Sequence, residues 1–289
     1  MTPSAERQGP IEFSIGNIKC STHTIDELVS EVVYLLKHPE EKSRALLCLN
    51  AHIYNLASKD ETLRAHLNDA RIVTADGMSI VWYSRVFGIP MPERCNMTEA
   101  FRAFLESEKF RNTRGILIGS TEAEATKAAR AIEGSSKHCT IVRAYSGYMA
   151  DKKYKQLFKS LNDVDFIFIG MGTPRTERIV DMASRYCPRA IAWGIGGGTI
   201  RIYAGSLKEA SPFWRRNGLQ WLHRLVTDPV HLWHRYLIGN PVFIFRAIRH
   251  GLKARAISEP VEISRKSPTF ATGTRVIHKS LTNVNTSNP

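Results

Sequence analysis

The feature that most constrains the fold is a regular alternation of short apolar runs with amphipathic segments through the middle of the chain. This order is typical of a mostly parallel sheet with helices on both faces. We expect strands at 45–50, 71–76, 115–120, 140–147, 165–172 and 190–198, and helices near 51–59, 78–87, 98–107, 121–133, 151–161 and 174–186. A capping box of Thr24 and Glu27 predicts a further helix that ends at about Lys37. In such an α/β core, ligands bind beyond the carboxyl ends of the strands.

The pattern changes after Gly205. The following segment lacks strand periodicity and is basic, aromatic and helical in spacing, with interruptions at Pro229 and Pro241. The sequence therefore predicts an α/β core at 11–205 and a helical appendage at 206–257. Residues 1–10 and 258–289 are poor in large apolar side chains, so we expect them to be disordered.

The net charge of the chain is +13, and much of the excess lies near the C-terminal end. The sequence from Arg201 to Arg255 contains ten Lys and Arg residues but only two acidic residues. Such an excess indicates a polyanionic partner. Basic and apolar residues interleave with tryptophans at helical spacing, which is typical of interfacial membrane helices and unlike the known nucleic-acid modules. We therefore expect an anionic membrane surface, and no nucleic acid, as partner. The side chains expected at the headgroups are Trp214, Trp221, Trp233, Arg215, Arg216, Arg246, Arg249, Lys253 and Arg255, and Phe243 and Phe245 are expected to add apolar depth.

The sequence also bears on the compartment. It has no uncharged apolar run of about 18 residues, and its N-terminus lacks the basic and apolar regions of a signal peptide. The five cysteines are scattered, odd in number and without a CxxC pair, which argues against structural zinc and a disulfide framework. These features predict a protein of the reducing cytoplasm.

Asp76 follows the predicted strand 71–76 and precedes a predicted helix. Two interpretations remain open for a carboxylate at this place. It can cap the helix that follows, or it can act as a general base, which must reach an acceptor hydroxyl within hydrogen-bond distance.

Two glycine-rich loops also follow strands. The first, at 170–178, leads into a helix through Pro174, and the second occupies 194–205. Glycines allow backbone to approach a phosphate or ribose, and helix N-termini attract anions. The second loop contains GxG without the full dinucleotide fingerprint or the acid expected about 20 residues later. A nicotinamide-binding domain is therefore disfavoured.

Two motifs suggest metal binding, and we expect neither to bind a metal. Asp163 and Asp165 match a DxD pattern, but they directly precede an apolar strand and so lie at the wrong end of the sheet. His231 and His234 lie three residues apart on one helix face, without an obvious acidic partner. Surface or anion contacts are the better explanation for these histidines.

Several motifs occur together and in order: CLN, TADG, PER, GMGTPRTE, a glycine loop ending in AG, GLQWLHRL, DP and RY. In this combination the chain resembles the WecG/TagA/CpsF glycosyltransferase family over about residues 14–250. The resemblance implies a core of Rossmann type, a UDP-sugar donor, an inverting mechanism without metal or cofactor, and an acceptor on polyprenyl pyrophosphate. It also implies an appendage that meets the inner face of the bacterial cell membrane and completes the active site.

The resemblance assigns roles residue by residue. Asp76 matches the catalytic base, Asn50 the asparagine of a TxN motif, Arg94 the arginine after the DG helix, and Glu177 the glutamate of a PKQE motif. Substrate-binding residues implied by the match, or by its glycine loops and appendage, are Cys48, Asn50, Arg94, Gly170, Gly172, Thr176, Glu177, Gly196, Gly197, Arg224, His231, His234 and Arg235. The chain departs from the family at Cys48, Arg175, Thr176, Arg201, Glu209-Ala210-Ser211, His231 and His234.

The hypothesis that follows is a single displacement in which Asp76 accepts the proton of the acceptor hydroxyl and positioned arginines stabilise the departing UDP. The product would be a surface or exopolysaccharide intermediate, made by a hexosyl- or N-acetylhexosaminyl-type transfer. Two alternatives stay open: a basic protein that binds membrane or nucleic acid, and a catalytically lapsed family member that acts as a scaffold. The sequence leaves open the donor sugar, the acceptor sugar, the linkage and whether the chain forms a homo-oligomer.

Overall fold

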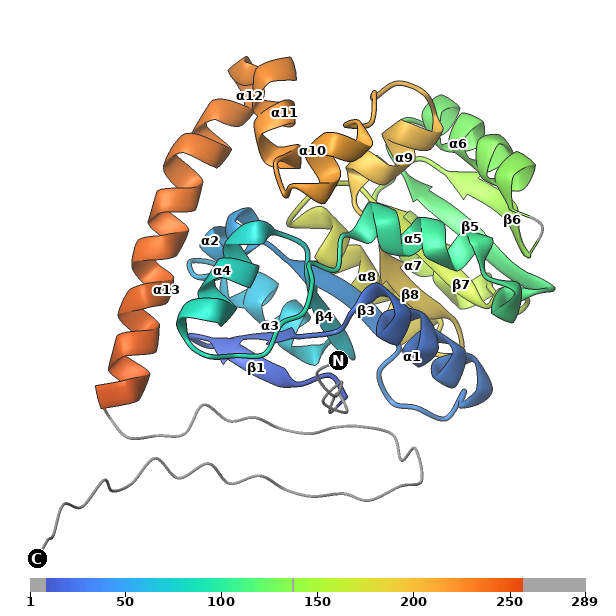
Figure 1. The fold of residues 1–289 in the computed structure, drawn as a ribbon. Coiled ribbons are helices and arrows are strands. Elements are labelled where there is room, and N and C mark those ends of the chain that lie inside the picture. The colour runs from blue at the N-terminus through green and yellow to red at the C-terminus, as the bar shows by residue number, and fades with distance from the viewer. Residues whose placement is uncertain (1–8, 137, 257–289) are drawn as a thin grey trace, which may run out of the picture.

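The computed structural model describes residues 9–136 and 138–256. Within them, eight strands form one sheet in the order β1-β2-β4-β3-β8-β7-β5-β6 (Figure 1). Only the β1/β2 pair is antiparallel, and the other neighbours pair in parallel. The strands are β1 Glu12–Ile15, β2 Ile18–Ser21, β3 Ala45–Leu49, β4 Ile72–Ala75, β5 Thr113–Gly119, β6 Cys139–Tyr145, β7 Phe166–Gly170 and β8 Ile191–Gly194. The predicted mostly parallel α/β fold is confirmed.

The helices of the core alternate with these strands. They are α1 Ile25–Lys37, α2 Ala51–Ala57, α3 Glu61–Asp69, α4 Met78–Val86, α5 Met97–Glu106, the 3₁₀ turn η1 Glu108–Phe110, α6 Glu122–Ser135, α7 Asp151–Ser160, α8 Arg175–Tyr186 and α9 Gly197–Tyr203. The capping box of Thr24 and Glu27 is present at the start of α1. The hairpin β1–β2, α3 and α9 are additional to the elements that the sequence predicted.

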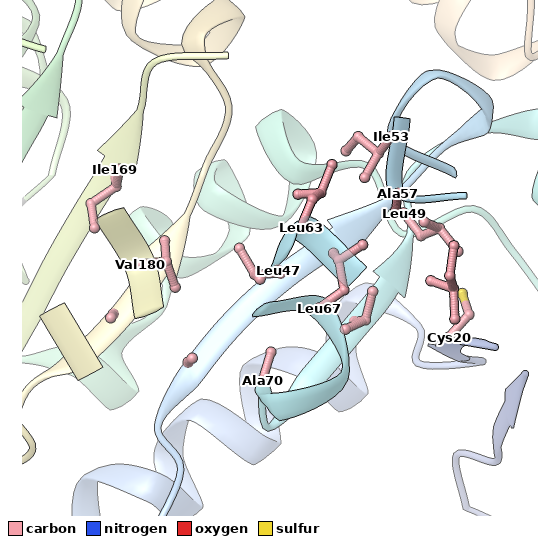
Figure 2. Close-up of a cluster of buried hydrophobic side chains, with 14 of the residues drawn as sticks. Cys20, Leu47, Leu49, Ile53, Ala57, Leu63, Leu67, Ala70, Ile169 and Val180 are labelled. Atoms are coloured by element: carbon pink, nitrogen blue, oxygen red, sulfur yellow. The ribbon is translucent and has the colours of Figure 1, made fainter. Parts of the chain in front are cut away.

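Two apolar layers hold the sheet. On one face, α3 and α8 cover β3 and β7, and Leu63 and Leu67 of α3 pack over Leu47 of β3 (Figure 2). On the other face, α1, α5 and α9 cover the sheet with an aromatic cluster that includes Phe101 and Trp193. Successive residues of a strand point to opposite faces of the sheet, so each strand is packed on both sides. This packing holds the carboxyl ends of the strands, and the loops that follow them, in place.

The segment after α9 is helical throughout and carries no strand within the described residues. Its elements are α10 Pro212–Arg216, α11 Gln220–Thr227, α12 Pro229–Trp233, the π-helical turn η2 His234–Ile238 and α13 Gly239–Ala256. We call residues 206–256 the appendage. None of the described helices combines the length and the apolar character that a bilayer crossing requires.

The appendage returns to the core through α13, which runs beside α2 and α4 on the side of the molecule opposite α6 (Figure 1). Phe243 is buried there and meets the Tyr54 ring edge-on at 5.1 Å. The Asn55 amide donates to the Gly239 carbonyl at 2.6 Å, and Arg246 donates to Ser58 Oγ at 2.8 Å. These contacts hold the appendage in a defined position over the carboxyl edge of the sheet. Residues 1–8 and 257–289, which include nearly all of the two segments predicted to be disordered, lie outside the described residues.

Candidate active site

A cavity of about 740 Å³ lies at the carboxyl edge of the sheet, between the loops after β3, β4, β7 and β8 and the appendage. Most of the residues that the sequence singled out line it: Cys48, Asn50, Asp76, Arg94, Gly170, Gly172, Thr176, Glu177, Gly196, Gly197, Arg224 and Arg235. His234 is exposed beside Trp233 and is not among the lining residues, so its predicted contact with pyrophosphate finds no support in the cavity. The side chain of His231 lies outside what the structure describes.

The Asp76 carboxyl group is held by the start of a neighbouring helix. Asn96 donates its side-chain amide to Asp76 Oδ1 at 2.8 Å, and the Met97 N–H donates to the same oxygen at 3.3 Å. The Cys48 thiol lies 3.9 Å from Oδ2. The residue at the N-cap of α4 is Gly77, and no side chain caps that helix. The helix-cap interpretation of Asp76 is therefore wrong for α4, and the carboxyl group faces the cavity.

Two opposing effects act on the pKa of Asp76, namely burial and the positive charge of nearby arginines. Burial raises the pKa of Asp76, while the charges of Arg94, Arg224 and Arg235 lower it. Burial disfavours the charged form and opposite charges favour it. The carboxylate is therefore stabilised by arginines from two parts of the chain, one in the core and two in the appendage.

Five arginines line the cavity: Arg94, Arg175, Arg201, Arg224 and Arg235. Arg94 is positioned by Gln220, which accepts from its Nη1 at 3.3 Å, and by Glu99 at 3.5 Å. Arg224 reaches α9, since a Cβ at Gly198 would lie 3.4 Å from its Nη2. Among the described residues, the acids that line the same space are Asp76 and Glu177. Guanidinium groups suit phosphate oxygens because they offer planar pairs of donors, so the cavity is suited to phosphorylated ligands.

The two glycine loops meet at the floor of the cavity. A Cβ at Gly170 would lie 2.6 Å from the Gly196 carbonyl oxygen, so this position requires glycine for close packing. Gly172 and Gly196 have open space around them, but their φ angles of 87° and 78° favour glycine. The loops therefore present backbone to the cavity at points where side chains would obstruct a ligand.

Glu177 lies in the first turn of α8 and is 3% exposed. Its Oε1 accepts from the Thr173 hydroxyl at 2.8 Å. Its Oε2 is buried and has no hydrogen-bond partner within the described part of the chain. Burial raises the pKa of this carboxyl group. An unpaired oxygen on a cavity wall is suited to a hydrogen bond from a ligand.

Several lining residues were not predicted from the sequence, namely His52, Asn96, Arg175, Arg201 and Gln220. Asn96 is the N-cap of α5 as well as a donor to Asp76, and an asparagine before a helix is a recognisable capping signal. Burial, with a smaller effect from Arg235, lowers the pKa of His52 to about 4, so this ring is neutral near pH 7. Gln220 lies within the GLQWLHRL motif and His52 closely follows the end of β3, so both had a usable signal, although neither was singled out.

The DxD motif lies at the opposite end of β7, as predicted. Asp163 pairs with Arg114 at 2.9 Å, and Asp165 accepts from the Arg114 N–H at 2.8 Å. Neither aspartate lines the cavity. Among the residues that the structure describes, no group of three or more His, Cys, Asp and Glu side chains is arranged to hold a metal ion.

The outer surface of the appendage is apolar. Its exposed large side chains on α12, η2 and α13 are Val230, Trp233, Leu237, Ile238, Ile244, Phe245, Ile248 and Leu252. We call these residues the apolar face.

Part of the predicted membrane contact is wrong. Arg215 pairs with Glu209 at 3.3 Å and Arg246 bonds to Ser58, so both face the protein. Trp221 lines the cavity, and Trp214 packs near Phe213 and His223. Phe243, expected to add apolar depth, is buried against Tyr54 instead, whereas Phe245 is exposed. Trp233 and Arg249 are exposed, whereas the side chains of Arg216, Lys253 and Arg255 lie outside the description.

Comparison with known proteins identifies the class. The family model described as glycosyl transferase WecG/TagA/CpsF family matches residues 13–257. The chain belongs to this family and is a glycosyltransferase.

Two curated relatives carry the same name, N-acetylglucosaminyldiphosphoundecaprenol N-acetyl-beta-D-mannosaminyltransferase. The protein from Bacillus spizizenii is 23% identical over 242 residues, covering 82% of this chain and 92% of the relative. The protein from Staphylococcus aureus is 23% identical over 248 residues, covering 83% of this chain and 94% of the relative.

Proposed function

We propose that the chain transfers a sugar from a UDP-sugar to a saccharide carried on polyprenyl pyrophosphate, in the synthesis of a bacterial surface or exopolysaccharide. The observation that carries the proposal is a half-buried carboxyl group, Asp76, in a cavity lined by five arginines. Both substrates carry a diphosphate, and each needs positive charge in the site. The names of the relatives specify a diphosphoundecaprenol acceptor with N-acetylglucosamine, which makes this lipid the first acceptor to test.

In the proposed reaction, Asp76 accepts the proton of the acceptor hydroxyl as its oxygen attacks the anomeric carbon of the donor. The new C–O bond forms on the face opposite the diphosphate, the bond to the diphosphate oxygen breaks, and UDP leaves with inversion at the anomeric carbon. The bonds from Asn96 and Met97 occupy Asp76 Oδ1. Oδ2, whose partner is the weak thiol donor of Cys48 at 3.9 Å, is the oxygen assigned to the acceptor hydroxyl. General-base catalysis requires this kind of reach.

The proposed mechanism assigns charge stabilisation to arginines and to no metal. Negative charge grows on the departing diphosphate, and preorganised donors aimed at it lower the barrier. Arg224 and Arg235 are the candidates because they line the cavity beside Asp76 and lower its pKa. Arg175 and Arg201 stand where the family usually has a lysine and an acid, so we assign them to the donor side and expect them to influence donor choice.

We further propose that the protein works as a peripheral protein on the inner face of the cell membrane. The lipid-linked acceptor would lie in that membrane, and the apolar face stands beside the mouth of the cavity. Exposed apolar patches of this kind mark contact with a partner or a membrane. The exposed Arg249 adjoins the apolar face and suits anionic headgroups.

The test is a donor screen with the purified full chain and N-acetylglucosaminyl diphosphoundecaprenol. UDP-hexoses, UDP-N-acetylhexosamines and UDP-uronic acids are offered in turn, and the anomeric configuration of the product is determined by NMR. We expect transfer from one donor class with inversion, and a strong reduction in Asp76→Asn. A folded protein that neither transfers nor hydrolyses any donor would instead favour the lapsed, scaffolding alternative.

A further inference from the structure

Among the described residues, four large side chains of apolar or aromatic character are exposed and also line the cavity; one is Tyr148, which carries a hydroxyl, and the other three are purely hydrocarbon or indole. These three are Trp82 of α4, Leu237 of η2 and Ile244 of α13, with exposed fractions of 46%, 57% and 41%. Pro241, between the last two, lines the cavity as well. We call Trp82, Leu237, Pro241 and Ile244 the apolar rim. Exposed apolar side chains at the opening of a polar cavity are unfavourable in water unless a ligand covers them. The rim therefore points to a ligand with an apolar part.

The rim is held in place by the packing of α13. Leu237, Pro241 and Ile244 are spaced four and three residues apart, which places them on one side of the helix. The buried Phe243 and Ala247 fix a different side of α13 against the core. The α4 helix, which carries Trp82, packs against α13. The rim is therefore a fixed border of the cavity, made by two elements far apart in sequence.

The rim joins two surfaces of opposite character. On its inner side, Arg235 and Arg224 line the same cavity. On its outer side, the apolar face continues along α13 through Phe245, Ile248 and Leu252. An apolar path therefore leads from the arginines to the surface. A ligand that matches this order has a diphosphate followed directly by a hydrocarbon chain.

We propose that the polyprenyl chain of the acceptor leaves the cavity over the apolar rim, with its pyrophosphate beside Arg235 and Arg224. The inference rests on the proposed function and adds the course of the lipid within the site. Contact with Trp82 on one side and Ile244 on the other would remove the first isoprene units from water. Burial of hydrocarbon in this way favours binding. The rim would thus distinguish lipid-linked acceptors from soluble sugar diphosphates.

The experiment uses two water-soluble acceptors with the same N-acetylglucosaminyl diphosphate head, below their micelle concentrations and without vesicles. One carries two isoprene units and the other a methyl ester. For the wild-type full chain, with the donor found in the screen, we expect a KM for the isoprenoid acceptor about tenfold below that for the methyl acceptor. Ile244→Ser and Trp82→Ser should raise the KM for the isoprenoid acceptor toward that for the methyl acceptor, and so reduce the difference to a ratio near one.

Ile248→Ser is the matched control. Ile248 lies one turn beyond Ile244, has nearly the same exposure at 40%, and is not among the lining residues. We expect it to keep the wild-type KM ratio. A ratio near one in the wild-type protein, or a ratio that survives in both Ile244→Ser and Trp82→Ser, would overturn the inference while leaving the proposed transfer intact. Equal effects of Ile244→Ser and Ile248→Ser would also overturn it, because the rim would then not differ from the rest of the apolar face. Absence of transfer from every donor in the screen with the undecaprenyl acceptor would refute the proposed function and this inference with it.

Discussion

At the scale of single residues, the proposed base can be tested by an almost isosteric change. Asp76→Asn retains an oxygen that can accept from Asn96 and Met97 but removes the capacity to take a proton. We expect the thermal unfolding midpoint to stay close to that of the wild-type protein and turnover to fall by roughly 100-fold or more. Steady-state kinetics with donor and acceptor in excess provide the measurement. Turnover near the wild-type rate would remove Asp76 from the mechanism.

The charges around Asp76 predict a pH dependence. The base acts when deprotonated, so activity falls as pH drops through the pKa of Asp76. Burial raises this pKa, while Arg94 and Arg224 lower it. Arg224→Met removes a positive charge, so the pKa rises further and the acid limb of kcat/KM moves to higher pH.

The measurement is the pH at which kcat/KM falls to half its maximum on the acid side, and not the maximum value of kcat/KM. Arg178→Met serves as the control, because Arg178 of α8 pairs with Asp151 of α7 and does not line the cavity. Its acid limb should coincide with that of the wild-type protein. An acid limb that stays in place or moves to lower pH in Arg224→Met would contradict the role assigned to this arginine.

At the scale of secondary structure, the sequence predicted most elements that carry a strong period. The exception is α3, which was missed although Asp60 caps it and Leu63 and Leu67 lie four residues apart on its buried side. The buried runs of β3, β5, β7 and β8, and the helices that directly follow β3, β5 and β7, were found because apolar spacing alone marks them. The hairpin β1–β2 was missed because each strand has four residues, although Gly16 and Asn17 at its turn are a usable signal. The helix α9 was missed because it begins with glycines. It is instead held by tertiary contacts, such as the Thr199 hydroxyl that donates to the Ile195 carbonyl at 2.6 Å.

The site was predictable where a residue follows a strand. Asp76 and the two glycine loops end strands whose carboxyl ends must share one edge of the sheet, so their meeting follows from topology. The contribution of the appendage depends on the docking of α13 and η2, which no local pattern specifies. Arg235 was recognised through the family resemblance, while the apolar rim became visible only when α4 and α13 were seen together.

The position of the DxD motif within β7 leads to a prediction about metal. Asp163 and Asp165 lie at the amino end of the strand, and the cavity lies at the carboxyl end. We expect the enzyme to remain active in EDTA, and Asp163→Ala to retain near-wild-type kcat/KM. Loss of transfer in EDTA with recovery on addition of Mg²⁺ or Mn²⁺ would return these two aspartates to consideration.

The docking of α13 predicts a stability difference between two phenylalanines on the same helix. Phe243 is 1% exposed against Tyr54, whereas Phe245 is 69% exposed. Phe243→Ala should lower the free energy of unfolding by about 3–5 kcal/mol, because it removes buried surface and leaves a cavity. Phe245→Ala should change it by no more than about 0.5 kcal/mol. Urea denaturation of both variants measures the difference, and equal values would mean that α13 does not pack on the core as described.

At the scale of the whole molecule, the apolar face and the basic charge define how the protein meets a membrane. The face lies on α12, η2 and α13, at the side of the molecule opposite α6 (Figure 1). We expect the full chain to bind vesicles that contain anionic lipid, and binding to weaken as salt rises, because salt screens the attraction of a protein with a net charge of +13.

The double variant Phe245→Glu, Leu252→Glu should lose most of this binding, since it places two negative charges on exposed positions of the apolar face. Ala123→Glu with Ala131→Glu on α6 makes the same change in net charge at the far side and should bind nearly as well as the wild-type protein. Vesicle co-sedimentation over a salt series compares the three proteins. If the two double variants lose binding equally, net charge rather than the apolar face governs the membrane contact, and the orientation proposed for the acceptor loses its support.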